Sequence, residues 1–224
     1  MTINYNPSFV TSGLVISLDA ANPRSYPGSG TTVYDVAGTT THSLVNGANY
    51  TVLSGVKCFD CSSSTYYMAP TVGGTAPILS TAGYTYVAWA RMKSSNAEWR
   101  TLWRTTPDDH PLLVQSGGTN LGMYDNNSTG FNDSGYNTTP YYDIWAQWTV
   151  VGSTATGSTF YINGAQVGSN VAQSTAGNRH NVIGGAGGSQ AFGYIGTAML
   201  YNDKMLSLAE ITQNYNALRG RFGV

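Results

Sequence analysis

The densest group of titratable residues in this chain is Asp108-Asp109-His110, which stands between Pro107 and Pro111. Carboxylates beside an imidazole are residue types used in general acid–base catalysis. That chemistry also needs partner groups held in a fixed geometry. The two flanking prolines instead predict a solvated turn. The cluster therefore does not by itself predict a catalytic site.

Glutamates and histidines are too scarce to supply an obvious alternative. The only glutamates are Glu98 and Glu210, and the only other histidines are His42 and His180. None of the histidines, His110 included, lies in a recognisable motif, so each is expected in a loop or at a strand end. Composition alone leaves a Ser-His-Asp triad open, but the pattern favours a protein that is not an enzyme.

Cys58 and Cys61 form a C-x-x-C pair, a spacing shared by redox and zinc sites. A structural zinc site needs four ligands, and the sequence has no second pair. In an extended segment, residues three apart point to opposite faces and lie roughly 10 Å apart, beyond disulfide reach. We expect two unpaired thiols, with Cys58 in the core.

A calcium loop is the next candidate. Residues 125–130 (DNNSTG) carry oxygen-bearing side chains at alternate positions and a glycine at the sixth, like the opening of an EF-hand loop. Tyr136 then stands where such a loop has its bidentate glutamate. We expect a long polar hairpin loop with local Asn and Asp turns, and no cofactor. A weak loop calcium site stays open as the alternative.

A glycan site would need aromatic faces for sugar rings and planar amides or carboxylates for hydroxyls. Tryptophan and tyrosine are also ordinary core residues, and Trp89, Trp145 and Trp148 lie in strand patterns where burial is expected. The candidates for a glycan site at one end of the domain are Asp125, Asn127, Asn132, Asp133, Tyr136, Tyr141 and Tyr142.

Charge and hydropathy exclude several classes of partner. Only 9% of the 224 residues are charged and the net charge is -1, so no basic footprint for nucleic acid is present. The apolar runs are too short to span a bilayer, and the start of the chain has no signal-peptide pattern. We therefore expect neither nucleic-acid binding nor membrane insertion.

Short candidate strands alternate with glycine-rich turns along most of the chain. Many short strands without alternating helices favour an all-β, antiparallel two-sheet sandwich. Asn163-Gly164 predicts a type I′ hairpin turn. The candidate strands are residues 14–18, 42–47, 57–60, 65–69, 84–92, 100–104, 112–116, 120–124, 145–152, 158–164, 181–185 and 193–201.

One short helix is predicted over residues 207–219, at the end of the chain. Ser207 and Glu210 have the spacing of a capping box, and Gly220 can take the left-handed C-cap conformation. Leu208, Ile211, Tyr215 and Leu218 follow at helical spacing as an apolar stripe. We expect a single domain over residues 1–224, with an N-terminal arm over residues 1–12.

Several segments in order resemble a known family. They are residues 13–38, 43–50, 58–67, 84–92, 145–168 and 193–224, the last being the nearest match. Together they are similar to the laminin G-like, concanavalin A-type jelly rolls, in the form found in tailed-bacteriophage virion proteins. The F-D-G-x-x-D-Y element departs from the pattern, with Cys61 for its glycine and no aspartate before the tyrosines. The paired carboxylates of glucanases on this fold are missing.

The resemblance implies a non-enzymatic virion structural protein, displayed as a capsid decoration or as the knob of a tail fibre. Its partners would be other virion proteins and copies of itself. It would be made in the host cytoplasm and reside on the virion surface. The alternative is an adhesin module that binds host-surface polysaccharide, and a polysaccharide depolymerase is a third reading.

Overall fold

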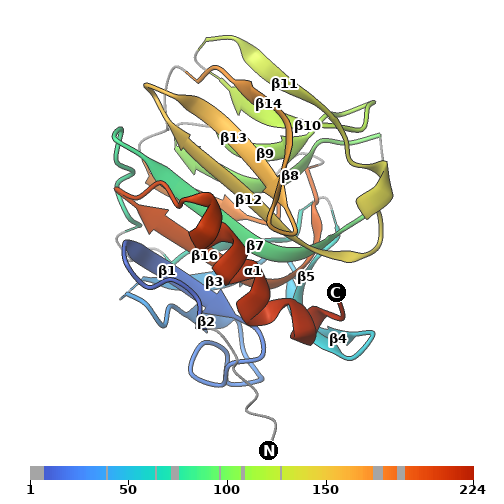
Figure 1. Ribbon diagram of the computed structural model, residues 1–224. Coiled ribbons are helices and arrows are strands. Elements are labelled where there is room, and N and C mark those ends of the chain that lie inside the picture. The colour runs from blue at the N-terminus through green and yellow to red at the C-terminus, as the bar shows by residue number, and fades with distance from the viewer. Residues whose placement is uncertain are drawn as a thin grey trace, which may run out of the picture.

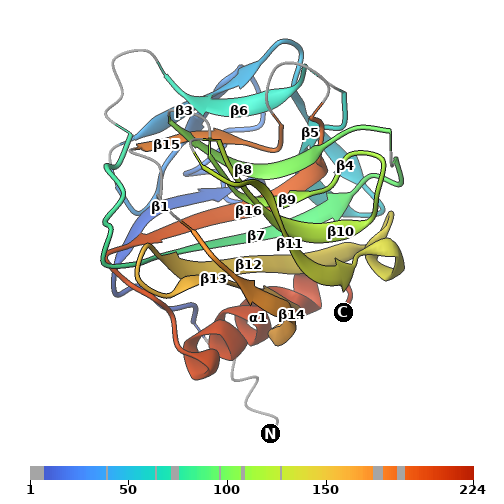
Figure 2. The same ribbon diagram turned by 90° about the horizontal axis from the view of Figure 1, so that it is seen from above.

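Two antiparallel β-sheets lie face to face, and one α-helix covers the outer surface of one of them (Figure 1, Figure 2). The computed structural model describes residues 8–38, 40–63, 65–71, 76–95, 97–106, 109–126, 128–173, 179–185 and 190–224. This architecture confirms the predicted antiparallel sandwich with a C-terminal helix.

Sheet A, the helix-covered sheet, has eight strands in the order β14-β13-β12-β7-β16-β5-β4, with β1 paired to β16. Asn163 and Gly164 connect β13 to β14 with φ values of 52° and 81°, which confirms the predicted type I′ turn. The strands are β1 (Leu14–Asp19), β4 (Asn49–Leu53), β5 (Val56–Cys61), β7 (Tyr84–Met92), β12 (Trp145–Ser153), β13 (Gly157–Ile162), β14 (Ala165–Val171) and β16 (Gly193–Asn202).

Sheet B also has eight strands, in the order β11-β10-β9-β8-β15-β6-β3-β2. A 3-10 turn, η1 (Thr139–Tyr141), follows its edge strand β11 in sequence. The strands are β2 (Thr32–Tyr34), β3 (Thr41–Val45), β6 (Tyr67–Pro70), β8 (Arg100–Thr106), β9 (His110–Val114), β10 (Asn120–Asp125), β11 (Gly130–Asn137) and β15 (Arg179–Ile183).

Strand β11 corrects the prediction of a long polar hairpin loop. Its residues pair with β10 from Asp125↔Gly130 to Asn120↔Asn137. Asn, Asp and Gly have low strand propensity, but an edge strand exposes one side to water and needs only one partner. Pairing with β10 therefore outweighs the local preference for turns.

The main hydrophobic core fills the space between the sheets, where alternate residues of facing strands interdigitate. Trp103 of β8 and Trp148 of β12 are fully buried there. In β10, Leu121 and Met123 point inward with the period of two expected for a strand that is open on its other side.

Both cysteines are free, as predicted, and both are buried, although only Cys58 was expected in the core. Cys61 belongs to the core between the sheets, whereas Cys58 packs in the cluster on the outer face of sheet A. Burial raises the pKa of Cys58 to about 12 and raises the pKa of Cys61 as well. Both are therefore kept as thiols.

Helix α1 (Leu208–Phe222) packs on the outer face of sheet A through an aromatic layer. The ring of Phe222 stacks on Trp89, with ring centroids 4.4 Å apart and an interplanar angle of 3°. Gly196 of β16 makes room for this ring, because a Cβ there would lie 2.5 Å from Phe222 Cε1. Strand β7 is consequently buried on both faces, which is why its sequence is an almost continuous apolar run.

The start of α1 confirms the capping box, but its end corrects the prediction. Ser207 Oγ accepts from the backbone of Glu210, and the Glu210 carboxylate accepts from the backbone of Ser207. The helix continues through Gly220 to Phe222, and Gly223 at φ 75° is the left-handed cap. The buried contact of Phe222 holds this additional turn. Leu208, expected in the apolar stripe, is 58% exposed.

The chain segment before β1 is anchored on the helix. Val10 N–H donates to Asn214 Oδ1 at 2.8 Å, and the hydroxyl of Tyr201 donates to Val10 O at 2.8 Å. Residues 1–7 of the predicted arm lie outside the described residues. The described helix is neither long nor apolar enough to cross a membrane.

Candidate functional site

The residues predicted as a glycan site do not converge at one end of the sandwich. Asp125 pairs with Gly130 at the turn of the β10–β11 hairpin, whereas Tyr136 pairs with Leu121 near its other end. At about 3.3 Å per residue, these positions lie roughly 13 Å apart along β10. Asn127 lies outside the described residues.

The three tyrosines of the predicted site pack against the main core. Tyr141 meets the edge of Trp148 at 5.8 Å between ring centroids, and burial raises its pKa to about 12. Tyr136 packs beside Tyr141 at 6.5 Å. The hydroxyl of Tyr142 accepts a 2.7 Å hydrogen bond from the buried guanidinium of Arg100. These rings close the end of the core.

The polar members of the predicted site make local contacts. Asn132 exchanges hydrogen bonds with the hydroxyl of Thr129, and Asp133 accepts from Asn120 Nδ2 at 2.8 Å. Asp125 is 1% exposed. Among the described residues, no group of three or more His, Cys, Asp and Glu side chains is placed to hold a metal ion.

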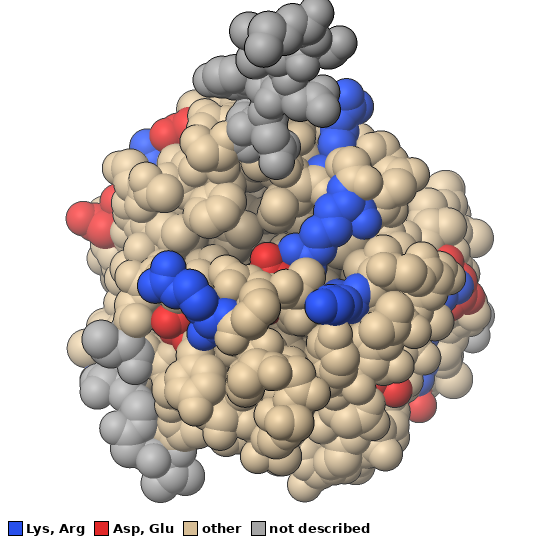
Figure 3. Space-filling view, turned by 90° about the horizontal axis from the view of Figure 1, so that it is seen from below, with Lys and Arg blue, Asp and Glu red and all other residues tan. Residues whose placement is uncertain are grey.

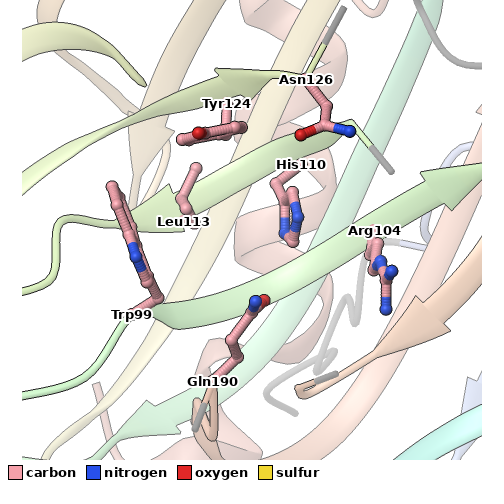
Figure 4. A pocket seen from close by; sticks show the side chains of 7 residues that line it. All are labelled: Trp99, Arg104, His110, Leu113, Tyr124, Asn126 and Gln190. Atoms are coloured by element: carbon pink, nitrogen blue, oxygen red, sulfur yellow. The ribbon is translucent and has the colours of Figure 1, made fainter. Parts of the chain in front are cut away.

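A different site lies on the outer face of sheet B, over strands β8, β9 and β10. A cavity of about 240 Å³ opens there. Figure 4 shows His110 and Leu113 at its centre, Trp99 and Arg104 on opposite sides, and Gln190 across from Tyr124. Its described lining residues are Trp99, Arg104, His110, Leu113, Tyr124, Asn126 and Gln190. We call this cavity the sheet B pocket.

The local sequence explains why these side chains face outward. Leu112 and Val114 of β9 enter the core, so Leu113 between them faces the other way. In β10, Tyr124 follows the inward-facing Met123. Gly122 lies one residue before Met123, and a Cβ there would meet Asn132 O at 2.3 Å. Because Gly122 has no side chain, the backbone of β11 can lie close to β10 beside the pocket.

Aromatic rings form one wall of the sheet B pocket. The Trp99 indole meets Tyr124 edge-on at 5.5 Å between ring centroids, and Phe131 at the same distance. Tyr124 also meets the ring of His110 at 5.9 Å. All three aromatic side chains of the wall are partly exposed. Rings held against one another in this way offer a rigid apolar surface to a ligand.

Hydrogen-bonding groups form the floor of the pocket. Thr101, fully buried beneath it, lies 3.1 Å from His110 Nδ1 and 2.9 Å from Gln190 Oε1 through its Oγ1. Asp109 Oδ1 accepts from the backbone N–H of Asn126 at 2.9 Å. The floor is therefore built by side chains from separate parts of the chain.

The solvated turn predicted around residue 109 is wrong for the described part of that cluster. Asp109 is 1% exposed and His110 is 7% exposed, because β9 begins at His110 and pairs on both sides. Asp108 lies outside the described residues. His42 and His180 stand near the starts of β3 and β15, as expected of strand-end residues, but both are buried.

The prediction missed Trp99, Arg104, Tyr124 and Gln190. Tyr124 carried a usable signal, since a large ring that alternates with the apolar Leu121 and Met123 marks the outward face of β10. Trp99 and Gln190 carried none, because only strand pairing brings residues so far apart in the sequence together.

Charged side chains are sparse on the surface. Figure 3 shows one face on which a few Lys, Arg, Asp and Glu side chains, some of them in contact with one another, interrupt a mostly uncharged area. Arg104 is the charged residue among the described residues that line the sheet B pocket. The pocket can therefore recognise a ligand chiefly by hydrogen bonds and by apolar contact.

Solved structures with a similar fold include a sialidase and a toxin domain. A Trypanosoma rangeli sialidase in complex with 2,3-difluorosialic acid is 15% identical, with a TM-score of 0.67 over 98% of this chain and 36% of the sialidase. The receptor binding domain of botulinum neurotoxin D is 14% identical, with a TM-score of 0.63 over 92% of this chain and 52% of that chain. This chain spans about a third of the length of the sialidase and about half of the length of the toxin domain.

Identities this low show a shared fold alone. No curated protein matches the chain in sequence. A family model does match, over residues 62–212, which is more than half of the chain. That match covers strands of both sheets and the start of the closing helix. The chain belongs to the concanavalin A-like lectin/glucanases superfamily.

Proposed function

We propose that this protein binds carbohydrate through the sheet B pocket. One observation carries the proposal: an aromatic wall and hydrogen-bonding groups line the same cavity. Trp99 and Tyr124 form the wall, and Asn126, Gln190 and His110 supply amide and imidazole groups. Aromatic faces suit the apolar sides of sugar rings, and the polar groups suit their hydroxyls.

The size of the pocket suits one sugar residue. Its volume of about 240 Å³ is below the roughly 300–1,000 Å³ of pockets that enclose drug-sized ligands. One protein of similar fold, a sialidase in complex with a sialic acid derivative, supports a saccharide as the ligand class.

The proposed activity is binding without cleavage. None of the described residues that line the pocket is a carboxylate. Asp109 and Asp125, which neighbour lining residues in sequence, are each 1% exposed. Glycoside hydrolysis by the usual route needs two carboxylates that flank the bond. Incubation with host polysaccharide should release no new reducing ends, and their release would contradict this part of the proposal.

A glycan array followed by calorimetry tests the pocket. Trp99→Ala should weaken saccharide binding by roughly tenfold or more, because the largest ring of the aromatic wall is lost. Tyr34→Ala is the matched control, since Tyr34 is a 46% exposed aromatic residue on the far edge strand β2 of the same sheet. Equal losses for both variants, or binding that depends instead on Asn132 and Tyr136, would contradict the proposal.

We also propose where the protein acts. The resemblance of residues 13–38 and 193–224 to tailed-phage virion proteins supports display on a virion, as a capsid decoration or a fibre knob. Its contacts would then be with other virion proteins and copies of itself. Electron microscopy of particles carrying a tagged copy of this chain should show the tag at a regular position. Particles without tag density would contradict this placement.

A further inference from the structure

Sheet B is weakly joined between β15 and β6. Among the described residues, the register of these two strands has a single pair, Ile183↔Met68. Four pairs join β15 to β8 on its other side, and four pairs join β6 to β3. Strands β2, β3 and β6 therefore form a three-stranded unit at one end of sheet B, which we call the edge unit (Figure 2).

The local backbone explains why the pairing of β6 with β15 stops so early. Pro70 of β6 lies opposite His42 of β3 and has no N–H group to donate to a further strand. Beside the start of β15, the His180 N–H donates to Pro77 O at 3.4 Å, and Ile78 forms an isolated bridge with Arg179. The backbone neighbour of His180 is therefore the segment that follows β6, and not β6 itself.

One side-chain contact spans this junction. The Nε2 atoms of His42 in β3 and His180 in β15 lie 3.2 Å apart, and both side chains are buried between the sheets. Neither Nδ1 atom has a hydrogen-bond partner among the described residues. Each imidazole thus makes its side-chain hydrogen bond with the other, and this bond links the edge unit directly to β15.

The surroundings of the pair are aromatic and uncharged. The ring of Trp103 in β8 lies 5.6 Å from that of His180, and the ring of Tyr86 in β7 lies 6.2 Å from it. Burial raises the pKa of Tyr86 well above its ordinary value, so this hydroxyl stays neutral. None of the strands β2, β3, β6, β7, β8 and β15 contains Asp or Glu.

The basic residues of these strands are engaged elsewhere. Arg104 lines the sheet B pocket on the outer face of the sheet, and Arg179 donates to Ala76 O at 2.9 Å. Arg91 and Arg100 donate to the segment that follows η1. A proton on either imidazole would therefore meet no opposite charge among the side chains of these strands.

We propose that the His42–His180 pair is an acid-sensitive latch, which holds the edge unit on β15 near neutral pH and lets sheet B open between β6 and β15 in mild acid. Two neutral rings share one hydrogen bond, in which one Nε2–H donates to the other Nε2. A first proton places an uncompensated charge in the core, and a second leaves two N–H groups facing each other. Opening hydrates both rings and exposes the inward-facing Leu44 and Met68 of the edge unit.

The direction of the pKa shifts gives the pH range of the latch. Burial lowers the pKa of His42 to about 4 and lowers the pKa of His180 well below its ordinary value, whereas hydrated rings titrate near ~6.5. Below ~6.5 the open arrangement therefore binds more protons, and the closed arrangement loses stability relative to it as the pH falls towards 4. At about pH 5 the opening equilibrium should be about 30-fold more favourable through His42 alone.

Hydrogen exchange followed by mass spectrometry tests the latch in the whole protein, after correction for the intrinsic effect of pH on exchange. Between about pH 7.5 and 5, peptides that cover β3 and β6 should lose protection by about 30-fold or more. At about pH 5 they should also exchange roughly tenfold faster, or more, than peptides from β12 of sheet A. Unchanged protection of β3 and β6 would overturn the proposal. Equal exchange of β3, β6 and β12 would do the same, because it would show one unfolding of the whole domain.

Histidine variants assign the acid response to the pair. His42→Gln/His180→Gln removes both titrating groups and keeps two neutral side chains that can share a hydrogen bond, so β3 and β6 should keep their protection at about pH 5. His110→Gln is the matched control, because it removes another buried histidine of sheet B that lies outside the pair. An acid response that persists in the double variant, or that disappears in His110→Gln, would overturn the proposal.

A single substitution provides a milder test. His42→Gln leaves His180 with a neutral partner and removes one of the two proton-binding groups. The loss of protection of β3 and β6 between about pH 7.5 and 5 should then be clearly smaller than in the wild type. A loss as large as that of the wild type would overturn the role of His42 in the latch.

Discussion

The imidazoles of His42 and His180 meet inside the sandwich, with their Nε2 atoms 3.2 Å apart. His42 comes from β3 and His180 from β15, and the two are 0% and 1% exposed. Burial lowers the pKa of His42 to about 4 and lowers the pKa of His180 well below its ordinary value. Both rings are therefore neutral near pH 7, so that one nitrogen donates and the other accepts.

This pair predicts a loss of stability in mild acid. In the unfolded chain both histidines titrate near ~6.5, so below that pH the unfolded state binds more protons than the folded state. The free energy of unfolding should therefore fall as the pH drops from ~6.5 towards 4, by about 3 kcal/mol from His42 alone and further from His180.

Urea denaturation across this pH range measures the effect. The double variant His42→Gln/His180→Gln keeps two neutral partners that can share a hydrogen bond, and it removes both titrating groups. Its free energy of unfolding should be much less dependent on pH between about 6.5 and 4. A pH dependence as steep as that of the wild type would contradict the assignment to this pair.

The stacking of Phe222 on Trp89 predicts that the last helical turn contributes strongly to stability. Phe222 is 4% exposed, and Phe222→Ala should lower the free energy of unfolding by about 3–5 kcal/mol, through lost burial and the cavity left behind. Val224→Ala is the control, because Val224 is 41% exposed two residues away. Denaturation followed by tryptophan fluorescence measures the free energy of unfolding of both variants. If Phe222→Ala lost as little stability as Val224→Ala, the stacking would not contribute as predicted.

The carboxylate of Glu210 is predicted to cap the helix and to have no catalytic role. It pairs with Lys204 Nζ at 2.7 Å and accepts from the Ser207 backbone at 2.8 Å, and these contacts, that with Lys204 first, lower its pKa. Glu210→Gln should cost about 0.5 kcal/mol or less, since glutamine also closes the box and an ion pair at the surface, here with partly exposed side chains, contributes little. Ser207→Ala should cost about 1 kcal/mol. A large loss of any activity in Glu210→Gln would falsify the capping role.

A buried amide between sheet A and α1 predicts a stabilising substitution. Gln147 is 1% exposed, and neither its Oε1 nor its Nε2 has a hydrogen-bond partner among the described residues. Burying an unsatisfied amide is unfavourable, so Gln147→Met should raise the free energy of unfolding by about 1 kcal/mol. Thermal denaturation measures the stability of this variant, and Gln166→Met, at an exposed position of β14, is the control. A destabilised Gln147→Met would indicate that ordered water bridges the amide.

Local sequence determined the parts of this fold that depend on near neighbours. The Asn163-Gly164 turn, the capping box of Ser207 and the inward–outward alternation of β10 all follow from conformational preferences or periodicity within a few residues. The run of many short strands without alternating helices likewise predicted an antiparallel sandwich, and the capping box predicted its closing helix.

The tertiary structure alone decided the candidate site. Pairing of β8 with β9 and β10, and the return of the chain at Gln190, bring together residues far apart in the sequence. Polar residues of β11 form an edge strand, and Tyr136 and Tyr141 pack, partly buried, against the core. Burial and long-range pairing are properties of the whole packed chain, so the spacing of residues could indicate which side chains bind sugars in general but not which of them meet at one pocket.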